Sequence, residues 1–265
     1  IGNTGGKKVV GYRNMGELVQ KAHSIAIRVT KKEALDLPEQ VDQVLYATLE
    51  PEVQRLYYQM ARESVAELSQ ERVITATNVL ARLLRLSQMT GGFVGENGSV
   101  EQVSHAKINL LSEVLDDLLN AGKKVVVFAR FIPEIEAILN LLNECNINHA
   151  WITGSVPQSE RGQAVERFQT DENCRVFVAQ LQTAGLGITL TAADTAIFYS
   201  LDYSYANYEQ CRARIHRIGQ RNTCTYIHLI ARNTVDEEVM DALKRKKNVA
   251  DLVVDRWQEI LQRRG

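Results

Sequence analysis

Residues 210–220, QCRARIHRIGQ, hold three arginines, one histidine and two glutamines, an unusual density of hydrogen-bond donors. Arginine is always charged, and its guanidinium is a planar fork of donors that suits phosphate oxygens. Two arginines a helical turn apart repel each other unless an anion lies between them. The stretch therefore favours an anion-binding site.

If residues 205–218 are helical, Gln210, Arg214 and Arg217 fall at positions i, i+4 and i+7 and form one polar stripe. A separate apolar stripe, which would dock on the rest of the protein, consists of Tyr208, Cys211, Ile215 and Ile218. The alternative to anion binding is a solvated helix face, or a salt-bridge network with Glu209 and nearby acids.

A second stretch, QLQTAGLGITLTAAD (180–194), follows a predicted buried strand and carries Gly185 and Gly187 among small residues. Glycines at such a place let the backbone approach a ligand and present its amides. A tight turn between a strand and a helix also needs glycine, so this stretch by itself is a weak signal.

A third stretch, ITGSVPQSERGQAVERF, ends a predicted strand at Thr153, Gly154 and Ser155 and begins a helix that bears Arg161. Hydroxyls and free amides at a helix N-terminus suit a phosphate. Ordinary N-capping by Ser155 is the alternative.

The composition of the chain limits the classes of protein that fit. Its 265 residues, 45% hydrophobic and 24% charged, are enough for one large or two modest domains. The formal net charge is −1, so affinity for nucleic acid must come from a local patch. One candidate patch, which would otherwise be a solvated helix face, is the cluster Lys244, Arg245, Lys246 and Lys247.

The four cysteines form no C-x-x-C pair, so we expect neither a metal site nor a disulfide framework. No run approaches eighteen apolar residues, so we expect no membrane span. The chain opens with Ile1 rather than Met and carries no signal peptide. These features predict a cytoplasmic protein, associated with the nucleoid if prokaryotic, and a piece of a longer polypeptide.

Hydrophobic periodicity divides the chain into two parts. In the first part, the pattern predicts a lead-in at 1–11, a short helix at 13–22 and strands at 24–30 and 41–49. A helical hairpin at 50–92 and a polar loop at 93–100 follow. The second alternates helices and strands. Its helices are predicted at 105–120, 133–143, 157–168, 205–218 and from 235 onward, and its strands at 123–129, 149–153, 175–180, 195–200 and 224–230. This alternation predicts a parallel sheet covered on both faces, with functional residues beyond the carboxyl ends of the strands.

In this order, these stretches resemble the C-terminal half of Swi/Snf-type ATPases, a branch of superfamily two of the helicases. The motifs that carry the resemblance are KKVVVFARF, ITGSVPQSERGQAVERF, QTAGLGITLTAADTAIFYSLD and QCRARIHRIGQ, together with LPEQVDQVLYATLEPEVQRLYYQM at the start of a helical insertion. The resemblance implies an α/β fold: a RecA-like second lobe whose parallel sheet has helices on both faces, preceded by the insertion. The corresponding segments are a lead-in at 1–40, a helical protrusion at 41–100 and a RecA-like domain with a helical tail at 101–265.

The resemblance also implies roles near a nucleotide. Arg214 and Arg217 match the family's paired arginine fingers, which reach nucleotide phosphates bound on the other lobe. Gln210 matches the glutamine of the same motif, and Gly185 and Gly187 match the glycines that lie near the nucleotide.

On the DNA side, Thr153, Gly154 and Ser155 match a loop that binds the DNA backbone, and Arg161 is a further DNA-binding candidate. The stretch DYSYANYEQ (202–210) lacks the Trp-Asn-Pro frequent in the family. In this it resembles prokaryotic or viral members.

The sequence contains no G-x-x-x-x-G-K-[ST] phosphate cradle and no Asp-Glu pair after an apolar strand. The resemblance therefore implies half of an ATP-driven translocase on double-stranded DNA, inactive alone. ATP and Mg²⁺ would be held by a missing N-terminal RecA-like lobe, and neither by this chain alone. The alternatives are a non-enzymatic module that binds nucleic acid or protein, and the motor subunit of a restriction or repair complex.

Overall fold

The structure, a computed structural model, describes residues 17, 21, 35–70, 76–96 and 99–245. Residues 1–37 and 38–265 form two separate units, and the sheet with its covering helices lies in the second. Four predicted segments lie outside the described residues: the lead-in at 1–11, most of the helix at 13–22, the strand at 24–30 and the tail after Arg245.

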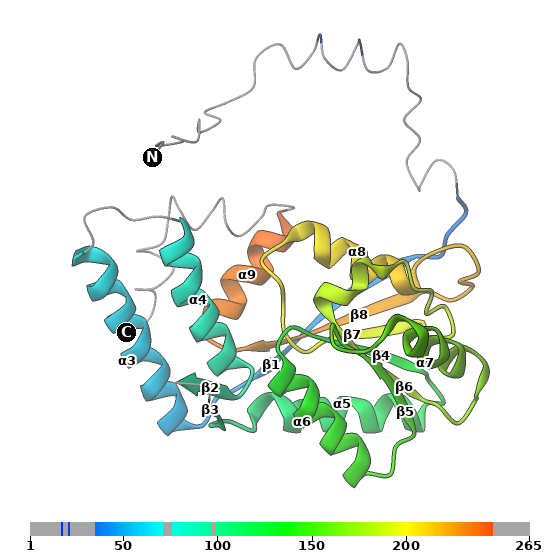
Figure 1. The fold of residues 1–265 in the computed structure, drawn as a ribbon, viewed down its shortest axis with the longest axis horizontal. Coiled ribbons are helices and arrows are strands. Elements are labelled where there is room, and N and C mark those ends of the chain that lie inside the picture. Colours follow the sequence, from blue (N-terminus) through cyan, green and yellow to red (C-terminus); the bar gives the residue numbers. More distant parts are fainter. Residues whose placement is uncertain (1–16, 18–20, 22–34, 71–75, 97–98, 246–265) are drawn as a thin grey trace. The chain divides into compact units, whose positions relative to one another are not determined.

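Six parallel strands form one sheet in the order β1-β8-β7-β4-β6-β5 (Figure 1). They are β1 (Gln40–Ala47), β4 (Val125–Ala129), β5 (His149–Ile152), β6 (Val176–Gln180), β7 (Thr195–Phe198) and β8 (Cys224–Ala231). Every residue of β4 is buried, as its unbroken apolar run predicts for a strand covered on both faces. The predicted parallel sheet is confirmed.

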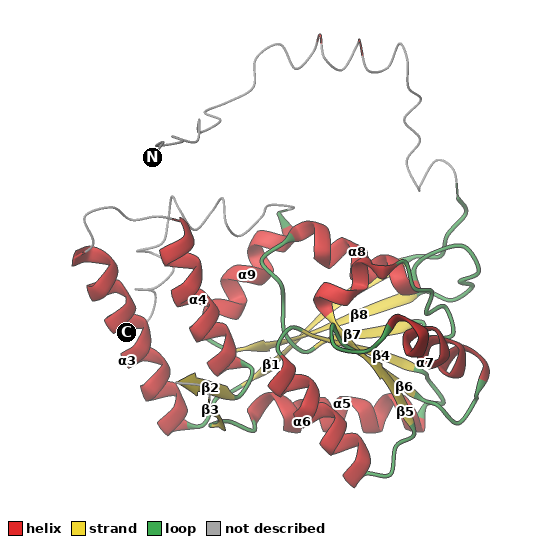
Figure 2. Cartoon of the chain, viewed as in Figure 1, coloured by secondary structure: helices red, strands yellow, loops and turns green. Residues whose placement is uncertain are grey.

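Helices cover both faces of this sheet (Figure 2). Because side chains alternate along a strand, Val125 and Val127 of β4 enter one core and Val126 and Phe128 the other. The first core contains residues of α5 (Ala106–Asn120) and α6 (Ile132–Glu144). The second contains residues of α7 (Gln158–Thr170), α8 (Tyr205–Ile215) and α9 (Val235–Lys244).

The predicted helical hairpin is present as α3 (Pro51–Gln70) and α4 (Ala76–Thr90), which lie side by side in Figure 1. Pro51 occupies the first position of α3, where its missing N–H costs nothing. The strand β1, which falls in the segment predicted as a helical protrusion, instead pairs along its length with β8. The helical part of that segment therefore begins at α3, and the other domain boundaries stay predictions.

Buried polar contacts fix the two helices to the lobe. Thr90 Oγ1 of α4 donates to Asp236 Oδ1 at 2.8 Å, and Val235 N donates to the Tyr57 hydroxyl of α3 at 2.7 Å. The Lys107 ammonium of α5 lies 2.5 Å from Asp236 Oδ2. A buried charge is costly without a partner, so this pair holds α5, α9 and the helical pair in one arrangement.

The prediction of a polar loop at 93–100 is wrong. This part of the chain contains an antiparallel pair of strands, β2 (Phe93–Glu96) and β3 (Ser99–Gln102). The dipeptide Asn97-Gly98 between the two strands is the strongest short hairpin signal in a sequence. A reading based on glycine content alone overlooked it.

Candidate functional site

The helix that carries the arginine motif is shorter than predicted. It ends at Ile215, with His216 as its C-cap, rather than at Ile218. Gly219 has a φ of +101°, which a side chain would strain, and the chain turns there. Ile218, predicted to dock in the core, is 72% exposed, whereas the rest of that stripe is buried. Arg217 therefore lies beyond the helix and shares no helical stripe with Gln210, which is exposed on α8.

The two arginines nevertheless converge. Nη1 of Arg214 and Nη1 of Arg217 both donate to the Ile188 carbonyl, at 3.5 Å and 3.1 Å. Neither forms an ion pair within the part of the chain that the structure describes, and Glu209, the acid expected to neutralise them, approaches Arg212 instead at 3.7 Å. Burial, followed by the charge of Arg217, lowers the pKa of Arg214. Two cations thus share one neutral acceptor, and an added anion would relieve their mutual repulsion.

The carbonyl that both arginines contact belongs to the glycine-containing stretch. A short 3₁₀ helix, η1 (Leu181–Leu186), includes Gly185, and Gly187 follows it in the left-handed region with a φ of 73°. Only glycine adopts this conformation without strain, so Gly187 directs the chain toward Arg214. Leu190 N then donates to Arg214 O at 2.9 Å.

One residue of this site was missed by the sequence reasoning. The Gln220 side chain is nearly buried, and its Nε2 donates to Ala193 O at 2.8 Å and to Ile215 O at 3.2 Å. Its Oε1 accepts from Arg221 N and Asn222 N at 2.9 Å and 3.0 Å. Gln220 thus fixes the end of residues 214–220 against the glycine-containing stretch. We call these residues the finger segment, after the role that the family resemblance implies for Arg214 and Arg217.

The sequence analysis predicted that the functional residues lie beyond the carboxyl ends of the strands. The finger segment does not lie there. In a parallel sheet, a helix between two strands runs back toward their amino ends. The last turn of α8 accordingly meets Leu190, which precedes β7, and Gln220 meets Ala193. The expectation fails here because Arg214 and Arg217 stand at and just beyond the end of the connecting helix, not at its start.

The second predicted group does follow a strand. After β5, Thr153 Oγ1 and Ser155 Oγ share a hydrogen bond of 2.8 Å. Arg161 Nη2 donates to Gly154 O at 2.8 Å and to Thr153 O at 3.3 Å. The N-cap of α7 is Pro157 and makes no side-chain capping bond, so N-capping by Ser155 is wrong. Arg161 holds this loop, residues 153–155, in shape.

Gln180, at the end of β6, is a second residue that the sequence reasoning missed. Its Oε1 accepts from Gly154 N at 3.0 Å, and its Nε2 donates toward Arg130 O at 3.4 Å. The Gly154 amide is therefore hydrogen-bonded, whereas the sequence analysis predicted free amides at this place. Gln180 joins the loops that follow β4 and β5, and a polar side chain at the end of a buried strand was the signal for it.

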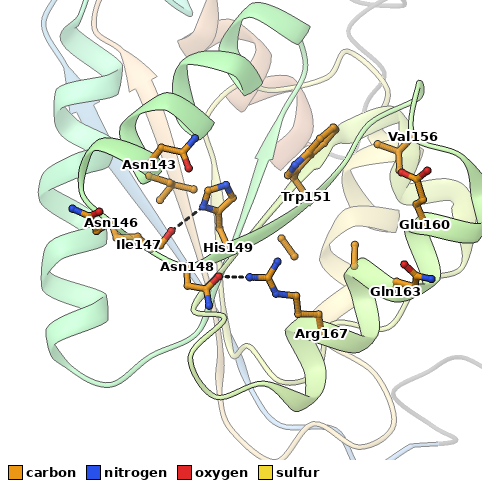
Figure 3. Close-up of a pocket in the computed structure, with 13 residues that line it drawn as sticks. Asn143, Asn146, Ile147, Asn148, His149, Trp151, Val156, Glu160, Gln163 and Arg167 are labelled. Carbon is orange, nitrogen blue, oxygen red and sulfur yellow. Dashed lines mark hydrogen bonds between the residues drawn. The ribbon is translucent and has the colours of Figure 1, made fainter.

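A pocket of about 940 Å³ runs along β5, the edge strand of the sheet (Figure 3). Trp151 is 40% exposed there, and Arg167 donates to Asn148 Oδ1. The pocket's charged residues are Glu160 and Arg167, so it has no excess of positive charge to attract a polyanion. None of the residues predicted for the site lines it.

Comparison of the sequence with known proteins indicates which class of protein the chain is similar to. The sequence model of the helicase conserved C-terminal domain matches residues 106–219. The chain is 27% identical over 234 residues to an uncharacterised ATP-dependent helicase of Mycoplasma genitalium, covering 88% of the chain and 23% of that protein. It is 30% identical over 259 residues to the mouse DNA annealing helicase and endonuclease ZRANB3, covering 95% of the chain and 22% of that protein. The chain thus spans about a quarter of these relatives.

Solved structures give the same fold. The Sulfolobus solfataricus SWI2/SNF2 ATPase C-terminal domain matches with a TM-score of 0.65 and 17% identity, over 86% of this chain and 100% of that one. The core of the same ATPase in complex with double-stranded DNA matches with a TM-score of 0.69 and 22% identity, over 94% and 56%. The fold is therefore the RecA-like C-terminal lobe seen in SWI2/SNF2 ATPases. The expected prokaryotic or viral origin stays a prediction.

Among the residues that the structure describes, no group of three or more His, Cys, Asp or Glu side chains is arranged to hold a metal ion. No helix in the described ranges is long and apolar enough to cross a membrane.

Proposed function

We propose that this chain is the second RecA-like lobe of a Swi/Snf-type, DNA-dependent ATPase that translocates on double-stranded DNA. The observation that carries the proposal is the convergence of Arg214 and Arg217 on one carbonyl, with no acid to neutralise them among the residues that the structure describes. The names of the relatives, ATP-dependent helicase and DNA annealing helicase, support it. So does the likeness to a SWI2/SNF2 core bound to double-stranded DNA.

In this proposal the phosphate cradle and Mg²⁺ belong to a first lobe, since this sequence holds no G-x-x-x-x-G-K-[ST] motif. ATP supplies the phosphoryl group, and Mg²⁺ neutralises part of its charge. Arg214 and Arg217 add two positive charges when the lobes close, and Gly187 and Gln220 hold them in place. The loop 153–155 contacts the DNA backbone without regard to sequence.

The test uses the full-length protein that joins this chain to a first lobe. We expect Arg214→Ala and Arg217→Ala each to slow DNA-stimulated ATP hydrolysis by about 10³- to 10⁵-fold, with a smaller effect on KM for ATP. Neither substitution should change the melting temperature of the chain much, because the two cations repel each other and compete for one acceptor. Arg221→Ala, which removes an exposed arginine of the neighbouring turn, is the matched control and should leave the rate unchanged.

The chain by itself should show negligible hydrolysis with or without DNA. Steady turnover that survives Arg217→Ala would reveal another nucleotide site and contradict the proposal. A full-length protein that binds DNA or a protein partner but never hydrolyses ATP would favour the non-enzymatic module. The motor subunit of a restriction or repair complex would share the arginine effect and differ in its associated subunits.

A further inference from the structure

The first residues of the compact unit are held by side chains from α8 and its cap. His216 Nε2 donates to Pro38 O at 2.8 Å, since a carbonyl oxygen only accepts. The Arg212 guanidinium donates through Nη2 to Gln40 Oε1 at 3.0 Å and to Asp42 Oδ2 at 3.1 Å, and through Nη1 to the other Asp42 oxygen. These partners stand at least 170 residues away in the sequence.

Arg212 is positioned by more than its charge. Its side chain is 12% exposed, and its guanidinium carbon lies 3.9 Å from the ring centre of Tyr226. Nη1 also donates to the Tyr208 hydroxyl at 2.8 Å. A fork-shaped contact with Asp42 on one side and aromatic stacking on the other leaves the guanidinium little freedom.

The two residues that make these contacts, Arg212 and His216, lie next to Arg214 and Arg217 in the sequence. His216 lies between Arg214 and Arg217 in the sequence, and Arg212 precedes Arg214 by two residues. The helix ends at Ile215, so Arg217 is not held by the helical backbone. Its place depends on the contacts of its neighbours, one of which reaches Pro38.

We propose that residues 38–42 set the position of the finger segment, with Arg212 and His216 as the positioning residues. The contacts form a direct path from the start of β1 to the residues on either side of His216. The consequence for catalysis rests on the proposed function. In a two-lobed ATPase the polypeptide from a first lobe enters this one through residues 38–42, so a change in the path of that segment moves the arginines toward or away from the nucleotide.

The test perturbs the start of β1 and observes the finger segment by amide hydrogen exchange of this chain. Asp42→Ala should accelerate exchange at His216 and Gln220, whose amides donate to Arg212 O and Arg217 O, by about 5- to 10-fold. Tyr46→Ala is the matched control, because Tyr46 is also exposed on β1 but contacts Arg232 at the other end of the strand. It should accelerate exchange only near the end of β1.

The amides of α5, on the opposite face of the sheet, serve as the reference for global unfolding. Asp42→Asn, which keeps one acceptor oxygen and removes the charge, should give a smaller acceleration in the same segment and covers the case in which Asp42→Ala does not fold. The inference is overturned if His216 and Gln220 exchange at the wild-type rate in both Asp42 variants, or respond equally to Tyr46→Ala.

A second measurement separates this inference from the proposed function. In the full-length protein, Asp42→Ala should lower kcat for DNA-stimulated hydrolysis about 5- to 10-fold while KM for ATP stays nearly constant, because the arginines are misplaced and the nucleotide site is intact. If the exchange result holds but the wild-type protein hydrolyses no ATP, the proposed function fails and the structural coupling stands. An unchanged kcat beside an altered exchange rate would overturn the catalytic part of the inference.

Discussion

The side chain of Gln220 uses both of its polar atoms inside the protein. The carboxamide contacts three carbonyls and two amides, and no apolar side chain can replace those five contacts. We expect Gln220→Met to lower the free energy of unfolding by about 2 to 3 kcal/mol, because buried backbone groups lose their partners. Urea denaturation of the chain measures the change. Gln210→Ala, at an exposed position of α8, should stay within about 0.5 kcal/mol, and an equal loss in both variants would contradict the role given to Gln220.

Gly91 is required by the space available to it. A Cβ at this position would lie 2.0 Å from Glu134 Oε1 and 3.2 Å from Gln88 O. Glu134 cannot move aside easily, since its Oε2 accepts from the Ser200 hydroxyl at 2.6 Å and from two backbone amides. We therefore expect Gly91→Ala to cost at least about 3 kcal/mol in the free energy of unfolding.

The matched control for Gly91 is Gly162→Ala. Gly162 lies within α7, where a Cβ would meet no other atom within 4 Å and the backbone has ordinary helical geometry. Alanine should stabilise the helix there by about 0.5 to 1 kcal/mol. The measurement is thermal unfolding of both variants. A Gly91→Ala protein as stable as the wild type would show that Gly91 does not lie against the Glu134 carboxylate.

At the scale of elements, the sequence predicted β4 from its apolar run but placed the end of α8 three residues too late. Continuous apolar runs such as VVVFA can only be satisfied inside a covered sheet, so β4 followed from composition. The end of α8 depends instead on His216 meeting Pro38, 178 residues away, and on Gln220 meeting Ala193. No local pattern encodes such contacts, and the helix was therefore predicted to continue to Ile218.

The same distinction applies to the candidate site. The arginine pair was predicted because its residue type and density are unusual. Gln180 was missed although it ends a buried strand, and Gln220 was missed because a glutamine has no distinctive spacing. Only the folded chain shows which backbone groups these two side chains contact. The engaged amide of Gly154 could not be foreseen either, because its acceptor lies on a different strand.

The junction of β1, β8 and α8 contains a histidine that should make stability depend on pH. His228 is fully buried; its Nδ1 donates to Gln43 O at 3.0 Å, and its Nε2 accepts from the Tyr208 hydroxyl at 2.9 Å. Burial lowers its pKa to about 4. Three charged groups face it: Asp42, 3.9 Å away, raises the pKa of His228, whereas Arg212 and Lys244 lower it.

Because the folded pKa lies below that of the unfolded chain, the unfolded state binds the proton more tightly. The stability that His228 contributes is complete above a pH of about 6.5 and is lost as the pH falls toward about 4. We expect this residue to account for about 2 to 3 kcal/mol of the loss between pH 7 and pH 4.5. Urea denaturation across this range should show a flatter profile for His228→Phe than for the wild type. Parallel profiles for wild type and His228→Phe would contradict the assignment.

At the scale of the whole molecule, a net charge of −1 leaves no general attraction for a polyanion. If the chain binds DNA, the interaction must come from a few local cations, and it should be weak, independent of base sequence and strongly reduced by salt. Each phosphate that a cation neutralises contributes about −0.9 to the slope of log affinity against log salt concentration. Three such contacts would weaken binding about 40-fold between 50 and 200 mM salt.

The helix α7 offers a matched pair of arginines to locate those contacts. Arg161 stands beside the loop 153–155, whereas Arg167, further along the same helix, is exposed and donates to Asn148 at the other end of β5. We expect Arg161→Gln to weaken binding to duplex DNA and to reduce the salt slope by about 0.9, because one phosphate contact is lost. Arg167→Gln should leave both quantities unchanged, as measured by fluorescence anisotropy over a series of salt concentrations. Equal effects of the two substitutions would mean that α7 attracts DNA only through its general charge, and no effect of either would place the DNA contacts away from the loop 153–155.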